Sequence, residues 1–169
     1  MSGGTVTATG GNATYCGAGI GGGGGGSSGH GGAGGTFVIS GGMVTAIGPA
    51  SSSSGYASAG IGGGNGHETG ARGTMTTLSG NAVVFASSIA PTITDGSNAT
   101  QAIVFNGNGG TMYGDVTLQQ DVTIPSGKTL NLSSGQTLTI PEEVALTNNG
   151  TIRKNGGTIS GTVSGNQPQ

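Results

Sequence analysis

Few residues in this chain of 169 could carry out acid–base or metal chemistry. A polysaccharide lyase on a β-rich scaffold needs carboxylates that hold a cation and a base that abstracts a proton. The acidic candidates are Asp95, Asp115 and Asp121. Asp95 precedes a glycine, which is typical of a turn, and the other two flank apparent strands. We therefore predict that the chain is not an enzyme and has no catalytic residue, metal site or cofactor.

Four residues are candidates for ligand binding because they recur in similar surroundings. Tyr15 and Tyr56 each stand shortly before an AGIGGG phrase, so they would form a ladder on which a sugar could stack, or else anchor a loop. His30 and His67 would face each other on neighbouring turns of the chain. No Cys or Asp accompanies both histidines at the spacing of metal ligands, which favours a pair of exposed loops.

The composition restricts the elements that can position these residues. Glycine contributes 41 residues, charged residues make up 6%, and the net charge is −2. So few large side chains fit only a narrow core of Val, Ile, Leu, Ala and Thr. A chain without a basic surface is not expected to bind nucleic acid, and no apolar run approaches the ~20 residues of a membrane span. The single cysteine, Cys16, has no partner for an internal disulfide.

Internal repeats organise the first half of the chain. Three phrases recur in the same order: SGGTVTATG at 2–10 as SGGMVTAIG at 40–48, GAGIGGG at 17–23 as SAGIGGG at 58–64, and, less exactly, GTFVISGGMVTA at 35–46 as GTMTTLSGNAVVFA at 73–86. Short β-rich runs bounded by glycines lie inside each phrase. The glycine tract at 21–26 is predicted either to form loops that leave the stack or to form polyproline-II-like segments packed in a bundle.

A different rhythm governs the last third of the chain. Short strands are predicted at Val122–Ile124, Thr129–Leu132, Thr137–Ile140 and Val144–Thr147, and turn residues separate them. About three such strands would make one coil of roughly 22 residues, within the range of solenoid repeats. The predicted fold is therefore all-β, a parallel β-helix (β-solenoid) with glycine-rich loops.

The predicted organisation is one continuous domain in three segments. Residues 1–90 form a glycine-rich repeat section, and residues 111–169 form tighter C-terminal β-coils. Residues 91–110 connect them and include an apolar strand at Ala102–Phe105.

The phrases SGGTVTATGG, AGIGGG and GTFVISGG resemble the glycine-rich repeats of large secreted or wall-attached surface proteins of gut Firmicutes. VTIPSGKTLNL and LTIPEEVALTNNGTI resemble the short coils that often follow such repeats. The resemblance implies parallel β-helices that serve as stalks, adhesins or carbohydrate-binding surfaces outside the cell. A more distant resemblance, through GGTVTAT, is to carbohydrate-binding β-helix proteins with pectate-lyase-like folds. Those proteins bind calcium through acidic turns, whereas the turns here carry Gly, Ser and Asn.

We therefore expect a structural or adhesive module of an extracellular or cell-surface protein, associating end to end into fibres through unpaired strands at the solenoid ends. The alternative is a carbohydrate-binding module whose partner is a polysaccharide or host glycan. A lyase-like enzyme and an ice-binding protein are weaker alternatives. The threonine array that would match ice, at Thr5, Thr7 and Thr9, is interrupted in the second repeat by Met43 and Ile47.

Overall fold

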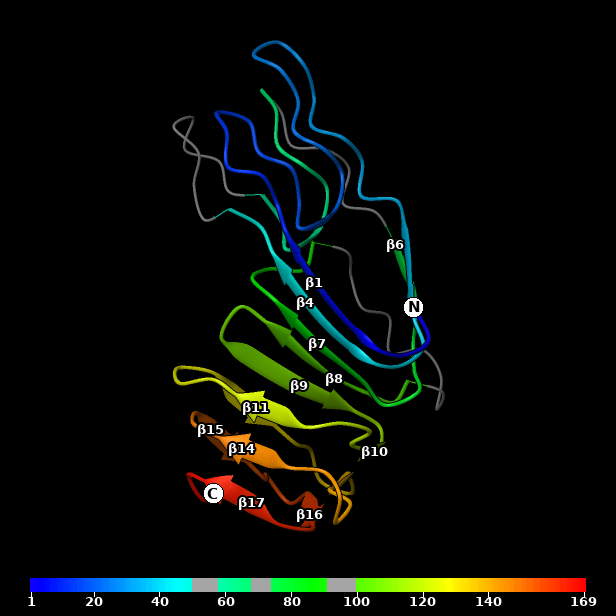
Figure 1. Cartoon of the computed structure of the whole chain (residues 1–169), viewed down its shortest axis with the longest axis vertical. Helices are drawn as coiled ribbons and strands as arrows, with labels where there is room; N and C mark the ends of the chain where they lie inside the picture. The colour runs from blue at the N-terminus through cyan, green and yellow to red at the C-terminus, as the bar shows by residue number, and fades with distance from the viewer. Residues whose placement is uncertain (50–57, 68–73, 91–99) are drawn as a thin grey trace.

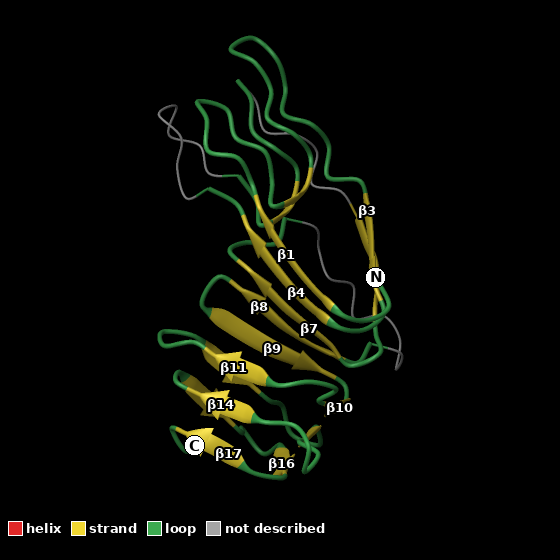
Figure 2. Cartoon of the chain, viewed as in Figure 1, coloured by secondary structure: helices red, strands yellow, loops and turns green. Residues whose placement is uncertain are grey.

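The computed structural model describes residues 1–49, 58–67, 74–90 and 100–169. Within these ranges every regular element is a β-strand; the strands form five sheets, and successive strands of a sheet follow one another along the long axis of the molecule (Figures 1 and 2). The seven-stranded sheet contains, in spatial order, β1 (Thr5–Thr9), β4 (Met43–Ile47), β7 (Ala82–Ala86), β8 (Ala102–Asn106), β9 (Gly109–Tyr113), β12 (Thr129–Asn131) and β15 (Thr151–Arg153).

The other sheets are small. Two have three strands: β10 (Val116–Thr117), β13 (Thr137–Thr139) and β16 (Thr158–Ser160) form one, and β11 (Val122–Ile124), β14 (Leu146–Asn148) and β17 (Val163–Gly165) the other. Two are strand pairs: β2 (Ile20–Gly21) with β5 (Ile61–Gly62), and β3 (Thr36–Ile39) with β6 (Thr74–Leu78).

The sequence repeats stack in parallel, with equivalent residues opposite each other. Thr5 of β1 lies opposite Met43 of β4, and Ile20 of β2 lies opposite Ile61 of β5. The less exact third repeat pairs the same way through β3 and β6, with a shift of register after Phe37. Equivalent glycine pairs precede β1 and β4, and the second glycine of each pair, Gly4 or Gly42, has a φ of 76° or 78°.

The C-terminal strands also agree with the prediction. β11 has the predicted limits, β12 and β13 end one residue early, and β14 begins at Leu146 because Pro141 to Val144 form a hydrogen-bonded turn. Each strand pairs in parallel with the strand one coil further on, as Leu130 does with Ile152.

One pairing departs from the all-parallel prediction. β8 and β9 form an antiparallel hairpin, in which Asn106 lies opposite Gly109. The connection is two residues long, and Gly107 adopts a φ of 62°, which a hairpin turn of this length favours. The hairpin reverses the chain, so β9, β12 and β15 run opposite to β1, β4, β7 and β8.

The hydrophobic core changes from one face of the seven-stranded sheet to the other. Side chains alternate between the two faces of a strand. Val84 and Val104 belong to a first core with Ile39, Ile61 and Leu78, whereas their neighbours in sequence belong to a second core with the C-terminal coils. In β7 and β8 those neighbours are Val83 and Ile103. These two strands are therefore buried on both faces, which explains their continuous apolar sequences.

The glycine tracts leave the sheet and pack against each other at one end of the molecule (Figure 1). The N–H group of Gly22 donates to Gly62 at 2.9 Å, and that of Gly64 donates to Gly32 at 2.9 Å. A β-carbon on Gly22 would overlap the carbonyl of Gly32. The tracts are thus loops that leave the stack, and they also pack against each other backbone to backbone. We call residues 16–34 and 58–67 together the glycine bundle.

Candidate functional site

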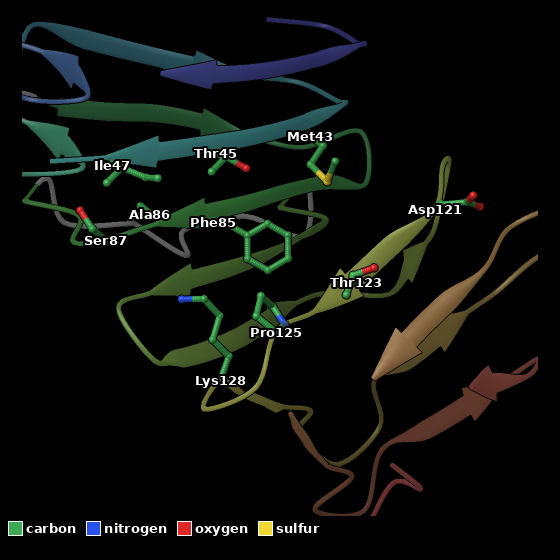
Figure 3. Close-up of a pocket in the computed structure, with 10 residues that line it drawn as sticks. All are labelled: Met43, Thr45, Ile47, Phe85, Ala86, Ser87, Asp121, Thr123, Pro125 and Lys128. Atoms are coloured by element: carbon green, nitrogen blue, oxygen red, sulfur yellow. The ribbon is translucent and has the colours of Figure 1, made fainter. Parts of the chain in front are cut away.

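A concave surface lies where the core changes faces. We call it the junction groove, and its volume is about 440 Å³. Its floor is the face of β4 and β7 that the second core leaves uncovered, and its wall is formed by β11 and the turn after it (Figure 3). The lining residues are Met43, Thr45, Ile47, Phe85, Ala86, Ser87, Asp121, Thr123, Pro125 and Lys128.

A supported aromatic ring forms the floor of the junction groove. Phe85 lies between Thr45 and Phe105 in the register of the sheet. The rings of Phe85 and Phe105 stack in parallel, with centroids 4.7 Å apart and planes at 8°. Phe105 is fully buried, which fixes the stack, whereas Phe85 is half-buried. On its other side Phe85 lies opposite Thr45, a smaller residue, and both side chains line the groove (Figure 3).

The charged groups at the groove are one cation and one anion. The Lys128 ammonium donates to the carbonyl of Gly107 and lies 5.8 Å from the centroid of Phe105. Burial lowers the pKa of Lys128. On the wall, Asp121 is exposed, and its Oδ1 accepts a hydrogen bond from the N–H of Ala145 at 2.8 Å. The two charges balance, so the groove is close to neutral.

The remaining lining is apolar with hydroxyl groups at its edges. Ile47 is 43% exposed, and Met43 and Pro125 add further carbon surface. Thr123 is exposed on the wall, and the hydroxyl of Ser87 accepts a hydrogen bond from Gly48 at 2.9 Å. The hydroxyl groups surround an apolar floor, an arrangement that fits a ligand with both apolar and polar faces.

Two contacts hold the wall in place against the N-terminal repeats. The N–H of Thr117 donates to Oδ1 of Asn81 at 2.9 Å, and Nε2 of Gln120 donates to Oγ1 of Thr5 at 3.4 Å. Asn81 adopts a φ of 60°, in the left-handed region that asparagine tolerates better than most residues. The segment between β10 and β11 is therefore anchored to β1 and to the turn before β7.

The residues predicted from the sequence to bind a ligand lie elsewhere. Tyr15 is half-buried and directly precedes the glycine bundle, and His30 and His67 are exposed within the bundle. The N–H of His67 donates to Gly29 at 2.9 Å, so the two histidines belong to adjacent segments. Tyr56 lies outside the described residues. None of the three described residues lines the junction groove, and a binding role for these four residues stays a prediction.

The acidic candidates have structural partners. Oδ1 of Asp115 accepts from the N–H of Thr137 at 2.7 Å, just as Asp121 accepts from Ala145 in the next coil. Asp95 lies outside the described residues. In the described ranges no three His, Cys, Asp or Glu side chains gather where they could hold a metal ion.

Sequence reasoning missed the aromatic floor, although two signals were present. Phe85 and Phe105 are two of only three phenylalanines, and each lies in a run of apolar residues too continuous for a strand with one buried face. The sequence Gly107-Asn108 between two β-rich runs is a hairpin signal. This signal would have placed Phe105, but not Phe85, beside a chain reversal.

Comparison with known proteins gives one match. A family model described as a β-helix repeat matches residues 1–24 and 37–65, which contain β1, β2, β4 and β5. No curated protein and no solved structure matches the chain. In the described ranges, no helix is long and apolar enough to cross a membrane. The chain is thus an all-β protein with parallel sheets, and its N-terminal part is similar to β-helix repeats.

Proposed function

We propose that this chain is a β-solenoid module with a structural and adhesive role in an extracellular or surface-attached bacterial protein. The observation that carries the proposal is the in-register stacking of repeats in a region that matches a β-helix repeat model. Each repeat contacts mainly its neighbours, as in elongated repeat proteins used as spacers and binding surfaces.

The composition supports a scaffold. Backbone hydrogen bonds between successive strands stabilise the stack, so the chain needs few large side chains and carries only 6% charged residues. The carboxylates of Asp115 and Asp121 join successive coils through backbone N–H groups, which supports a structural role for them over a catalytic one.

End-to-end association into fibres stays a prediction. β1 is the edge strand at one end of the seven-stranded sheet, and Val6 in it is 40% exposed. At the other end, Gln169 exchanges backbone hydrogen bonds with Ile152 and Lys154, beside β15. The two ends thus present different surfaces. Sedimentation velocity at several concentrations, with electron microscopy, would detect fibres if the ends associate.

An adhesion assay tests the proposed function. Beads coated with the folded chain are expected to adhere to surfaces coated with polysaccharide, mucin or host cells under flow. Beads coated with albumin or with the heat-denatured chain provide the controls. Adhesion no greater than that of both controls on every surface would contradict the adhesive part of the proposal.

A further inference from the structure

We propose that the junction groove binds a neutral oligosaccharide, with the open face of the Phe85 ring as the stacking platform. This inference rests on the proposed function, because it names the ligand class and the surface through which the module would adhere. Four features of the groove carry it: the aromatic ring, the polar edges, the charge balance and the protected strand edge.

The aromatic ring has the geometry of a sugar platform. Sugars present a face of C–H groups that packs on an aromatic ring, and the ring must be accessible on one side and held on the other. Phe105, which is fully buried, holds Phe85 in a parallel stack at 4.7 Å, and Phe85 itself is half-buried and lines the groove beside the smaller Thr45. The ligand therefore meets a ring that is already in place, which reduces the entropy cost of binding.

The polar edges provide partners for sugar hydroxyl groups. The hydroxyls of Thr45 and Thr123 both donate and accept, and the Lys128 ammonium has two donors beyond the one directed to Gly107. Oδ1 of Asp121 already accepts from Ala145, which leaves a second carboxylate oxygen on an exposed side chain. These groups surround an apolar floor, as in most small-molecule sites.

The charge balance selects among sugars. One ammonium and one carboxylate line the groove, so neither a sialylated nor a uronic-acid chain gains a net attraction. A volume of about 440 Å³ is within the usual range of small-molecule sites. A neutral oligosaccharide, with part of its length in the groove, fits both properties.

An extended peptide fits less well. β11 is an edge strand in the described part of the chain, so a peptide could add to it as a further strand. However, β11 has only three residues, and Pro125, which has no N–H group, follows it directly. A short edge that ends in proline is protected against strand addition.

The test is a glycan array probed with the full chain, followed by calorimetric titration of the neutral oligosaccharides that bind. Phe85→Leu keeps apolar packing but removes the ring, and Thr45→Phe covers the open ring face. Each is expected to weaken binding about three- to tenfold or more, from the usual strength of aromatic contacts. Phe85→Trp is expected to retain binding. Val38→Ala, at a position that is 47% exposed and does not line the groove, is the control.

Circular dichroism and urea unfolding first establish that each variant is folded. Binding to no neutral glycan, or equal binding by wild type, Phe85→Leu and Thr45→Phe, would overturn the inference. The bead assay separates the two proposals. If beads coated with wild type adhere, and beads coated with either groove variant adhere equally well, the groove assignment fails and the proposed function stands. If adhesion is lost on protease treatment of the target surface and unaffected by free glycan, the ligand is a protein and the inference is wrong.

Discussion

Alanine at two adjacent glycines tests the glycine bundle. Gly22 and Gly23 stand side by side in a run of six glycines, so their sequence surroundings are almost identical. Gly22 is buried, and a β-carbon on it would overlap the carbonyl of Gly32 and approach the nitrogen of Gly64 within 2.8 Å. Gly23 is exposed, and a β-carbon on it would have no atom within 4 Å. Neither glycine has a positive φ, so only the available space differs.

The two substitutions are expected to change the free energy of unfolding by different amounts and in different directions. Overpacking in a well-packed site costs about 1–3 kcal/mol, and here the obstructing atoms are backbone, which cannot rotate away. Gly22→Ala is expected to reach or exceed this range because it separates segments that Gly22 and Gly64 hold together through hydrogen bonds. Gly23→Ala is expected to be neutral or to stabilise by about 0.4–1 kcal/mol, since it restricts only the unfolded chain.

Urea unfolding followed by far-UV circular dichroism measures the difference, and hydrogen exchange locates it. Exchange of the amides of Gly25 and Gly64 is expected to be slow in wild type and in Gly23→Ala, and faster in Gly22→Ala, because both amides donate within the bundle. Equal stability and equal exchange in the two variants would show that the glycine segments are not packed as described.

Three further predictions concern the junction between the two cores. Phe105→Ala removes a fully buried ring and is expected to lower the free energy of unfolding by about 3–5 kcal/mol in urea; a loss below about 1 kcal/mol would contradict its place in the core. Asn81→Ala removes the acceptor for Thr117 and strains a left-handed backbone, for an expected loss of about 1–3 kcal/mol, whereas Asn81→Asp, which keeps the acceptor, should lose less. Because burial lowers the pKa of Lys128, the unfolded chain binds more protons between that pKa and 10.5. The stability of wild type relative to Lys128→Met is therefore expected to rise with pH in this window, and a fall would contradict the sign.

Much of the stacking could be predicted from the sequence. The repeated phrases fixed the partners of β1 and β2, because a parallel stack places equivalent residues opposite each other. The spacing of turns likewise located β11 to within its exact limits. Both predictions depend on local patterns of two to nine residues, which a sequence displays directly.

The change of face and the groove could not be predicted in the same way. The strand predicted at Ala102–Phe105 within the connecting segment 91–110 is β8, but its place inside the large sheet, with both faces buried, has no local signal. The chain reversal at Gly107 sets the direction of β9, β12 and β15, and with it the side of the sheet on which the second core forms. Phe85 in β7 and Thr123 in β11 line the same groove from strands far apart in sequence, so no local pattern joins them.

The central claim is that the C-terminal coils pack against the face of the seven-stranded sheet opposite to the first core. Cross-linking of Thr5→Cys with Gln120→Cys tests it most directly, because these side chains lie 3.4 Å apart across the junction. Both pairs are made in a Cys16→Ser chain, which removes the natural cysteine. The control pair is Thr5→Cys with Ser164→Cys, because Ser164 is on β17 at the far end of the stack. With a short bismaleimide reagent at low protein concentration, the account predicts an intramolecular cross-link in the first pair and none in the control. No cross-link in the first pair, or equal yields in both, would contradict it.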